Sequence, residues 1–320
     1  MMPESSPNGA AAPSRLPLRP PLRIALCHLD SLVCLPGLNV LFAEMGDQIG
    51  LVILSRRFGP RHGGVFTQLR RGLRRSGWRM TLWLGFDIVS AQIASAIAAM
   101  TAPLFTAPLF DRERPLASVR SLAARHGANM IEVADVNDAK TIATVSAFAP
   151  DLVLVFNFDQ ILQPAFIDTA ASGVINVHPS YLPAFRGPCP VFWAMARGCR
   201  ETGVSLHTIT NADIDAGPIL RQERRTIDRA QSAAEITSAL FVAGARLVPE
   251  VVRQAATGGL RSLPQQGSPG EYHGFPAAGD VARAARRGVR LCRAGFVLRL
   301  FAAAIGRAAA RAAPQAGAGS

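Results

Sequence analysis

Residues 151–156 read DLVLVF, a continuous apolar run typical of a strand that is buried on both faces of a parallel sheet. Upstream of this run, helical and strand-like patterns alternate. We expect a helix near 116–126, a strand near 129–133 and a helix near 137–148. Strands that are joined through helices in this way lie parallel to one another. The sequence therefore predicts an α/β domain built on a doubly wound, mostly parallel sheet.

The same alternation extends towards both ends of the chain. From Leu22 the sequence predicts a strand (LRIALCHL), a break at Pro36 and Gly37, a helix (NVLFAEMGDQI) and a second strand at 51–55. Later segments predict strands near 174–177, 203–209 and 218–226, and helices near 190–197 and 231–256. The chain accordingly divides into a disordered tail (1–20), a main α/β domain (21–258), a linker (259–280), and an Arg- and Ala-rich helix with a tail (281–320).

Composition and charge restrict the class of protein. The hydrophobic fraction of 49% and the charged fraction of 18% are those of a globular chain, which excludes wholesale disorder. The formal net charge of +12 favours an anionic partner such as nucleic acid, a nucleotide-linked substrate or an anionic membrane, and a solvated Arg-rich surface is the alternative. The 5 Cys lack CxxC spacing and the N-terminal residues lack a signal-peptide pattern, so we expect a cytoplasmic protein with reduced thiols.

A basic and apolar segment at 56–110 interrupts the alternation. It begins with Arg residues at helical spacing (Arg70, Arg71, Arg74 and Arg75) and then turns apolar from 80 to 105. The apolar part is long enough to span a membrane, but Asp87 and Gln92 make it a poor span. We expect a helical insertion, with a pair of helices that pack on the sheet or lie at an interface.

Polar side chains follow the strand predicted at 174–177. Asn176 and His178 alternate along its end, so both point towards the carboxyl edge of the sheet, where open α/β sheets bind ligands. The later loop TNADIDAG brings Asp213 and Asp215 to the same edge, and a carboxylate near an imidazole holds it charged and oriented. A structural hydrogen bond for His178, a turn at Asn176 and a turn or helix end at the acidic loop remain alternatives.

Three separated runs contain these residues: INVHPSYLPAFRG at 175–187, ETGVSLH at 201–207 and IDAGPIL at 214–220. In this order and spacing, they resemble the folate-dependent formyltransferases. The resemblance implies a Rossmann-like catalytic domain (21–258) that transfers a formyl group from 10-formyltetrahydrofolate to a primary amine, with Asn176, His178 and Asp215 as catalytic residues. Negative charge builds on the formyl oxygen during attack, and donors from Asn176 and a protonated His178 would stabilise it while Asp215 keeps His178 cationic.

The resemblance also implies binding residues on neighbouring loops. The folate pocket would be formed by the loop after the strand at 151–156 and by the loop before the catalytic Asp, namely Phe158, Asp159, Gln160, Ile161, Leu162, Asn211, Ala212 and Asp213. Ser180, Arg186 and Gly187, which follow the catalytic His along the chain, are the implied substrate-binding residues. No metal is expected.

Several departures from the family bear on the acceptor. Residues 29–37 read LDSLVCLPG and lack the Gly-rich phosphate loop of the purine-pathway members, so that role is not expected. A small or carrier-linked amine, with an amino sugar preferred, is the leading expectation. Methionyl-tRNA is the alternative acceptor, although the C-terminal region lacks the strands of a tRNA-binding barrel. A non-catalytic binding protein with the same fold is a further alternative.

The segment 281–311, predicted as one helix, combines basic and apolar halves. Its first half carries Arg283, Arg286, Arg287, Arg290 and Arg293 on one face, and its second half is largely apolar. Docking on its own domain is one alternative. Because the segment at 70–105 shows the same combination, we predict salt-sensitive peripheral contact with an anionic membrane at its inner face.

Overall fold

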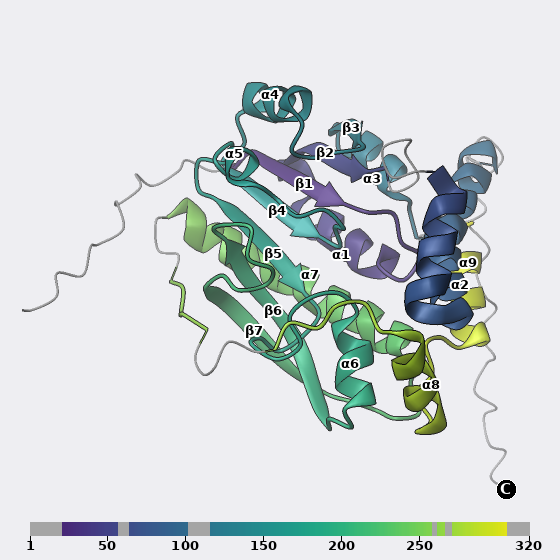
Figure 1. Cartoon of the computed structure of the whole chain (residues 1–320). Helices are drawn as coiled ribbons and strands as arrows, with labels where there is room; N and C mark the ends of the chain where they lie inside the picture. Colours follow the sequence, from purple (N-terminus) through teal and green to yellow (C-terminus); the bar gives the residue numbers. More distant parts are fainter. Residues whose placement is uncertain (1–20, 57–63, 102–115, 258–260, 266–270, 306–320) are drawn as a thin grey trace, which may run out of the picture.

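A seven-stranded sheet forms the centre of the computed structural model, which describes residues 21–56, 64–101, 116–257, 261–265 and 271–305 (Figure 1). The strands are β1 (Ile24–His28), β2 (Ile49–Ser55), β3 (Asn129–Val133), β4 (Leu152–Phe156), β5 (Val174–His178), β6 (Glu201–Ile209) and β7 (Ile219–Thr226). They lie in the order β3-β2-β1-β4-β5-β6-β7. All pairs from β3 to β5 are parallel, and the β5–β6 and β6–β7 pairs are antiparallel. The predicted doubly wound, mostly parallel sheet is confirmed.

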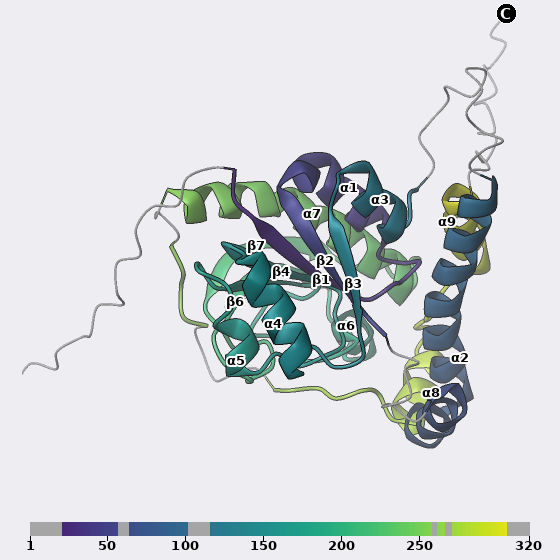
Figure 2. The same cartoon turned by 90° about the horizontal axis from the view of Figure 1, so that it is seen from above.

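Helices cover both faces of this sheet. The helices of the described residues are α1 (Leu35–Met45), α2 (Gly64–Thr101), α3 (Val119–Arg125), α4 (Ala139–Phe148), α5 (Pro164–Ile167), α6 (Pro190–Ala196), α7 (Ala233–Ala256), α8 (Ala278–Arg286) and α9 (Ala294–Ala304), of which α2, α8 and α9 lie together beside the sheet (Figure 2). The helices α1, α3 and α7 lie on one face, and α4 and α5 on the other (Figure 2). Phe42 and Phe241 belong to the core on the first face, and Val145 and Phe166 to the core on the second. The strand order reverses between β1 and β4, where such sheets bind ligands.

The helix α1 begins earlier than the sequence indicated. The predicted break at Pro36 and Gly37 was wrong, because both residues lie in the first turn of α1. Proline is tolerated there, since the N–H that it lacks has no partner within the helix. A Cβ at Gly37 would lie 2.8 Å from the backbone carbon of Phe241, so glycine allows α1 to approach α7 closely.

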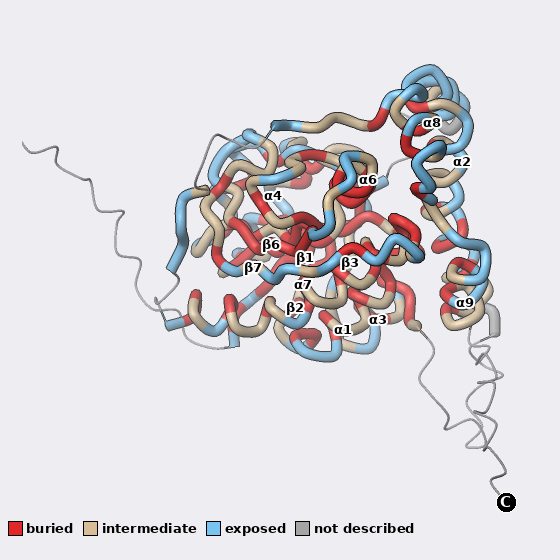
Figure 3. Tube along the Cα trace, turned by 90° about the horizontal axis from the view of Figure 1, so that it is seen from below, coloured by how far each residue is buried: buried red, intermediate tan, exposed pale blue. Residues whose placement is uncertain are grey.

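The basic insertion contains the predicted pair of helices. Within α2, Gly77 has a non-helical conformation (φ 73°) and separates a first helix from a second. By length and composition alone, Phe66–Ile97 is long and apolar enough to cross a membrane, with a mean hydropathy of 1.4, and 28% of its apolar window is buried. Met80 and Ala91 join the main core, and α2 lies beside α8 and α9, alternating between buried and exposed positions (Figure 3).

The C-terminal segment contains two helices rather than the single helix predicted at 281–311. Gly288 has a φ of 82° and lies between α8 and α9. A left-handed residue ends a helix, and glycine adopts this conformation without a Cβ clash. Of the five Arg residues expected on one helical face, Arg283 and Arg286 lie in α8, whereas Arg287, Arg290 and Arg293 lie outside both helices. The predicted basic face is therefore not formed as one helical surface, and the apolar second half lies in α9. The predicted tails at 1–20 and beyond 305 lie outside the described residues, as do 57–63 and 102–115 of the insertion.

The segment predicted as a linker, 259–280, packs against the domain in its described parts. Tyr272 forms an isolated bridge with Arg186, and the ring of His273 stacks on Trp193 with centroids 5.1 Å apart. The segment thus passes over the loop that follows β5 and contributes to the site described next.

Candidate active site

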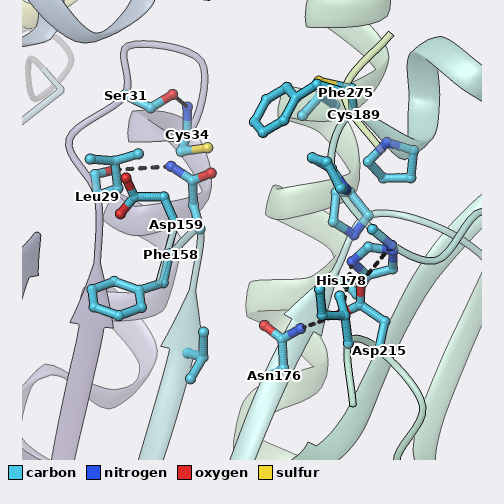
Figure 4. A pocket seen from close by; sticks show the side chains of 18 of the residues that line it. Leu29, Ser31, Cys34, Phe158, Asp159, Asn176, His178, Cys189, Asp215 and Phe275 are labelled. Atoms are coloured by element: carbon cyan, nitrogen blue, oxygen red, sulfur yellow. Dashed lines mark hydrogen bonds and ion pairs between the residues drawn. The ribbon is translucent and has the colours of Figure 1, made fainter. Parts of the chain in front are cut away.

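The predicted catalytic residues meet at the carboxyl edge of the sheet (Figure 4). Asn176 and His178 lie two residues apart on β5, and the connection between β6 and β7 brings Asp215 to them. All three line a cavity of about 490 Å³. Strand alternation and the antiparallel return of β6 and β7 bring these three residues to the same edge of the sheet.

Asp215 lies at the centre of the group. Its Oδ1 is 3.5 Å from Nδ1 of His178 and 3.4 Å from Nε2 of His207, and its Oδ2 accepts the N–H of Gly187 at 2.8 Å. Burial by itself raises the pKa of Asp215, but the two imidazoles and the N–H outweigh it and hold the pKa well below its ordinary value of 3.8. The carboxylate is therefore ionised at neutral pH.

Both ring nitrogens of His178 face oxygen acceptors. Nδ1 faces Asp215, and Nε2 lies 3.2 Å from the carbonyl oxygen of Phe185. Burial lowers the pKa of His178 and the charge of His207 adds to this effect, while Asp215 and the Phe185 carbonyl oppose it. The site thus holds an imidazole that gives up its proton more readily than an exposed histidine.

The neighbours of Asn176 determine the orientation of its amide. Nδ2 is 3.1 Å from Oδ1 of Asp215 and 3.0 Å from Nε2 of His207. Because a carboxylate can only accept, the NH₂ group must face Asp215. The carbonyl oxygen of Asn176 is then directed away from Asp215, towards the cavity (Figure 4). In this arrangement Asn176 presents an acceptor to a ligand, and not the donor that we expected from the resemblance.

His207 completes the group, although sequence reasoning did not single it out as a site residue. It pairs with Asn176 across the antiparallel register of β5 and β6, and its side chain is 1% exposed. Nδ1 lies 2.9 Å from the carbonyl oxygen of Thr208, which leaves Nε2 towards Asn176 and Asp215. His207 could be identified from its position opposite Asn176, but that position is known only once the pairing of β5 and β6 is known.

The backbone around Asp215 is held by residues outside the predicted site. Asp215 has a left-handed φ of 51°. Nε2 of Gln265 donates to the carbonyl oxygens of Asp215 at 2.8 Å and of Gly217 at 2.9 Å. A Cβ at Gly217 would collide with the carbonyl oxygen of Thr208, so this turn requires glycine. Gln265 is a positioning residue, and it lies in the segment predicted to be a linker.

Every residue predicted to bind folate lines the same cavity as the catalytic group. These residues are Phe158, Asp159, Gln160, Ile161, Leu162, Asn211, Ala212 and Asp213. The side chain of Gln160 anchors its loop, because it accepts the N–H of Val136 at 2.7 Å and donates to Oγ of Ser55 at 2.9 Å. The geometry brings both loops to one cavity, and their contact with folate stays a prediction.

The predicted substrate-binding residues have different surroundings. Gly187 lines the cavity. Arg186 donates through Nε and Nη2 to the carbonyl oxygen of Ile214 at 2.9 and 2.7 Å, and the buried Ser180 donates to the carbonyl oxygen of Ala184 at 2.8 Å. Arg186 and Ser180 therefore brace loops around the site. Within the ranges that the structure describes, no group of three or more His, Cys, Asp or Glu is placed to hold a metal ion.

Comparisons with known proteins match this part of the chain. The family model described as formyl transferase matches residues 106–252. A methionyl-tRNA formyltransferase of Synechococcus sp. (strain JA-3-3Ab) is 38% identical over 135 residues, which are 42% of this chain and 42% of the relative. A methionyl-tRNA formyltransferase of Geobacillus sp. (strain WCH70) is 32% identical over 161 residues, 50% of each protein. The chain thus spans about half the length of the curated relatives it matches.

Solved structures cover more of the chain at lower identity. A sugar 3N-formyl transferase, solved in the presence of dTDP and 5-N-formyl-THF, has a TM-score of 0.49 and 15% identity, covering 79% of this chain and 70% of its own. The phosphoribosylglycinamide formyltransferase from Anaplasma phagocytophilum has a TM-score of 0.49 and 18% identity, covering 79% of this chain and 98% of its own.

Proposed function

We propose that this chain, whose residues 106–252 match the formyl transferase family model, transfers a formyl group from 10-formyltetrahydrofolate to a primary amine. The observation that carries the proposal is the convergence of Asn176, His178 and Asp215 on one cavity, at the distances given above. A binding protein without catalysis has no need for a buried carboxylate held between two imidazoles. The non-catalytic alternative is therefore disfavoured.

The reaction exchanges one bond and one proton. The amine nitrogen forms a bond to the formyl carbon, the bond from that carbon to the folate nitrogen breaks, and a proton passes from the amine to the departing nitrogen. His178 suits the proton transfer, because its lowered pKa makes the imidazolium a ready donor. Asp215 stays ionised, and it orients His178 and stabilises its charged form.

His178 and Asn176 also act on the reacting atoms. In this structure Nε2 of His178 faces the carbonyl oxygen of Phe185 at 3.2 Å, and its N–H stabilises the negative charge on the formyl oxygen when it turns from that carbonyl to the donor. One such donor contributes on the order of 3 kcal/mol. The carbonyl oxygen of Asn176 accepts an N–H of the attacking amine and so orients its lone pair towards the formyl carbon.

The residues of the cavity fit a folate donor. Its volume of about 490 Å³ is in the range of small-molecule sites. Phe158 and Ile161 offer apolar surface on one side, and the loop at 211–215 offers peptide groups on the other. The donor supplies the formyl carbon, and the chain positions it.

The acceptor is a primary amine on a small or carrier-linked molecule. The sequence favours an amino sugar, and the names of the curated relatives favour methionyl-tRNA as the alternative. A cytoplasmic location fits the free state of all the cysteines, from Cys27 to Cys292.

We also propose peripheral contact with an anionic membrane through α2. Large apolar side chains are exposed along its second helix, at Trp78, Leu82, Phe86, Val89 and Ile93. At 3.6 residues per turn they fall within about 80° of the helix circumference, so they form one continuous apolar stripe. Exposed Arg residues on the first helix supply the complementary charge: Arg70, Arg71 and Arg74.

The proposed activity is tested by incubating the purified chain with 10-formyltetrahydrofolate and separate pools of aminoacyl-tRNA, amino-sugar nucleotides and simple amines. Mass spectrometry then detects the added formyl group. The variants His178→Ala and Asp215→Ala should each lower the rate at least about 100-fold while the donor still binds. His126→Ala, a change outside the cavity lining, is the control. Near-normal turnover in either site variant would refute the mechanism.

A further inference from the structure

The cavity extends from the catalytic group to α2. Met80, Trp83, Leu84 and Ile88 of α2 line this extension. Apolar residues from other elements complete it: Val33, Phe192, Phe241, Phe275 and Leu291. Figure 4 shows Phe275 beside Cys189, with Leu29 and Cys34 across the cavity. The walls that lie nearest α2 are therefore hydrocarbon and aromatic, which favours an apolar ligand.

The charged residues of the cavity lining are acidic, whereas the chain as a whole is basic. Among the described residues that line the cavity there is no Lys or Arg, although the chain carries 34 of them. The carboxylates in the lining are Asp87, Asp159, Asp213 and Asp215. The guanidinium of Arg186 donates to the carbonyl oxygen of Ile214. The guanidinium of Arg75 lies 3.9 Å from the ring centroid of Phe275, and Arg75 is not one of the lining residues. Such a lining repels phosphate and attracts ammonium.

The carboxylate of Asp87 accepts hydrogen bonds from the loop between β1 and α1. Oγ of Ser31 donates to Oδ2 of Asp87 at 2.6 Å, and the N–H of Val33 donates to Oδ1 at 2.9 Å. A loop that leads into a helix at the edge of an α/β sheet is a common position for a phosphate. Here the insertion supplies the anion from within, so a phosphate at this loop would meet the charge of Asp87.

From the apolar wall, the acidic lining and the position of Asp87, we infer that the acceptor is an amphiphilic primary amine without phosphate. The inference rests on the formyl transfer proposed above. The amino group lies at Asn176, His178 and Asp215, and the apolar chain or ring lies against α2. Nucleotide-linked amino sugars and tRNA carry phosphates, and the lining residues in the described part of the chain offer those phosphates no Lys or Arg.

Binding of a graded amine series to the full chain tests the inference without any need for catalysis. Calorimetry compares ethanolamine, butylamine, hexylamine and octylamine with phosphoethanolamine. We expect affinity to rise about fourfold for each added methylene that reaches the α2 wall, and phosphoethanolamine to bind more weakly than ethanolamine.

A matched pair of variants locates the binding. Leu84→Asp places a charge on the wall, whereas Leu69→Asp changes a 40% exposed leucine on the first helix of α2, outside the cavity lining and outside the apolar stripe. We expect Leu84→Asp to lower octylamine affinity at least tenfold and Leu69→Asp to leave it unchanged. Circular dichroism checks the fold, and Leu84→Ala replaces Leu84→Asp if the latter does not fold, with weaker octylamine binding expected again.

Three outcomes would overturn the inference. They are an affinity that does not depend on chain length, phosphoethanolamine binding more tightly than ethanolamine, and a Leu84→Asp variant that loses affinity for 5-formyltetrahydrofolate but not for octylamine. The last outcome would assign the wall to the donor. If the amines bind as expected but no formamide forms when 10-formyltetrahydrofolate is added, the proposed activity fails while the ligand class of the cavity stands.

Discussion

The side-chain amide of Gln265 donates to the carbonyl oxygen of Asp215 at 2.8 Å, across 50 residues of sequence. Asp215 has a φ of 51°, a left-handed conformation that costs a residue with a Cβ about 1 kcal/mol or more. Such a conformation persists where the surrounding contacts enforce it. The carboxylate that His178 and Asn176 contact is thus placed by a residue from a different part of the chain.

Replacing Gln265 by Leu should lower the rate of formyl transfer about tenfold, because the two hydrogen bonds to Asp215 and Gly217 each contribute about 1 kcal/mol. The donor should bind almost as well as before, since Gln265 is not part of the cavity lining. Steady-state kinetics together with calorimetry on 5-formyltetrahydrofolate measure the two effects. Gln254→Leu, on α7, removes a hydrogen bond to Glu250 and is the control. Equal losses in both variants would contradict a positioning role.

The buried imidazole of His178 should make the stability of the protein depend on pH. Its pKa in the folded state lies below the ordinary value of 6.5, mainly because of burial, so the unfolded chain takes up the proton first as the pH falls. The free energy of unfolding should therefore decrease below about pH 6.5, and His178→Gln should lose this part of the decrease. Urea unfolding between pH 5 and 8 measures it. Parallel curves for the two proteins would show that His178 is not the titrating group.

Asp215 should contribute a second acid transition at lower pH. Its pKa in the folded state lies below the ordinary value of 3.8, so the stabilisation that it provides is present above that pH and lost as the pH falls further. Unfolding experiments on Asp215→Asn between pH 2 and 5 test this assignment. The variant should be less stable than the unmodified chain at pH 5, and the difference should shrink towards pH 2.

The sequence predicted the centre of the sheet because β1, β2 and β4 are largely continuous apolar runs. Strand ends and loop order predicted that Asn176, His178 and Asp215 lie at one edge of the sheet, and the family resemblance implied their catalytic roles. Sequence reasoning missed His207 because that role depends on the antiparallel register with Asn176. It missed Gln265 because a Gly- and Pro-rich segment predicts a loop but does not predict which surface of the domain the loop packs against.

The start of α1 shows how packing can override a local signal. Gly37→Ala should destabilise the fold by about 1–3 kcal/mol, because its Cβ would lie 2.8 Å from the backbone of Phe241. Gly85→Ala, where a Cβ meets open space on α2, should be neutral or stabilise the fold by up to about 1 kcal/mol. Thermal unfolding of both variants checks the contrast. Similar stabilities would mean that α1 and α7 do not pack so closely.

The predicted folate loop should be sensitive to charge. Ile161 is 49% exposed and lines the cavity, so Ile161→Asp places a carboxylate where we expect the apolar part of the donor. Affinity for 5-formyltetrahydrofolate should fall at least tenfold. Leu298→Asp, at a 67% exposed position of α9, should leave it unchanged. An Ile161 variant that is folded and binds normally would place the donor elsewhere.

The exposed stripe on α2 should hold the protein on anionic vesicles. Leu82 and Phe86 lie at its centre, so the double variant Leu82→Asp/Phe86→Asp should abolish co-sedimentation with vesicles that contain phosphatidylglycerol, because it removes buried apolar area and adds negative charge. Leu263→Asp, a change at another exposed apolar position, is the control. Raising the salt concentration should weaken binding by the unmodified chain, because salt screens the attraction between the Arg residues of the first helix and the anionic lipids.

Binding that survives in the double variant would reject the stripe as the membrane contact. A double variant that turns a dimer into a monomer in light scattering would assign the stripe to a second copy of the chain instead.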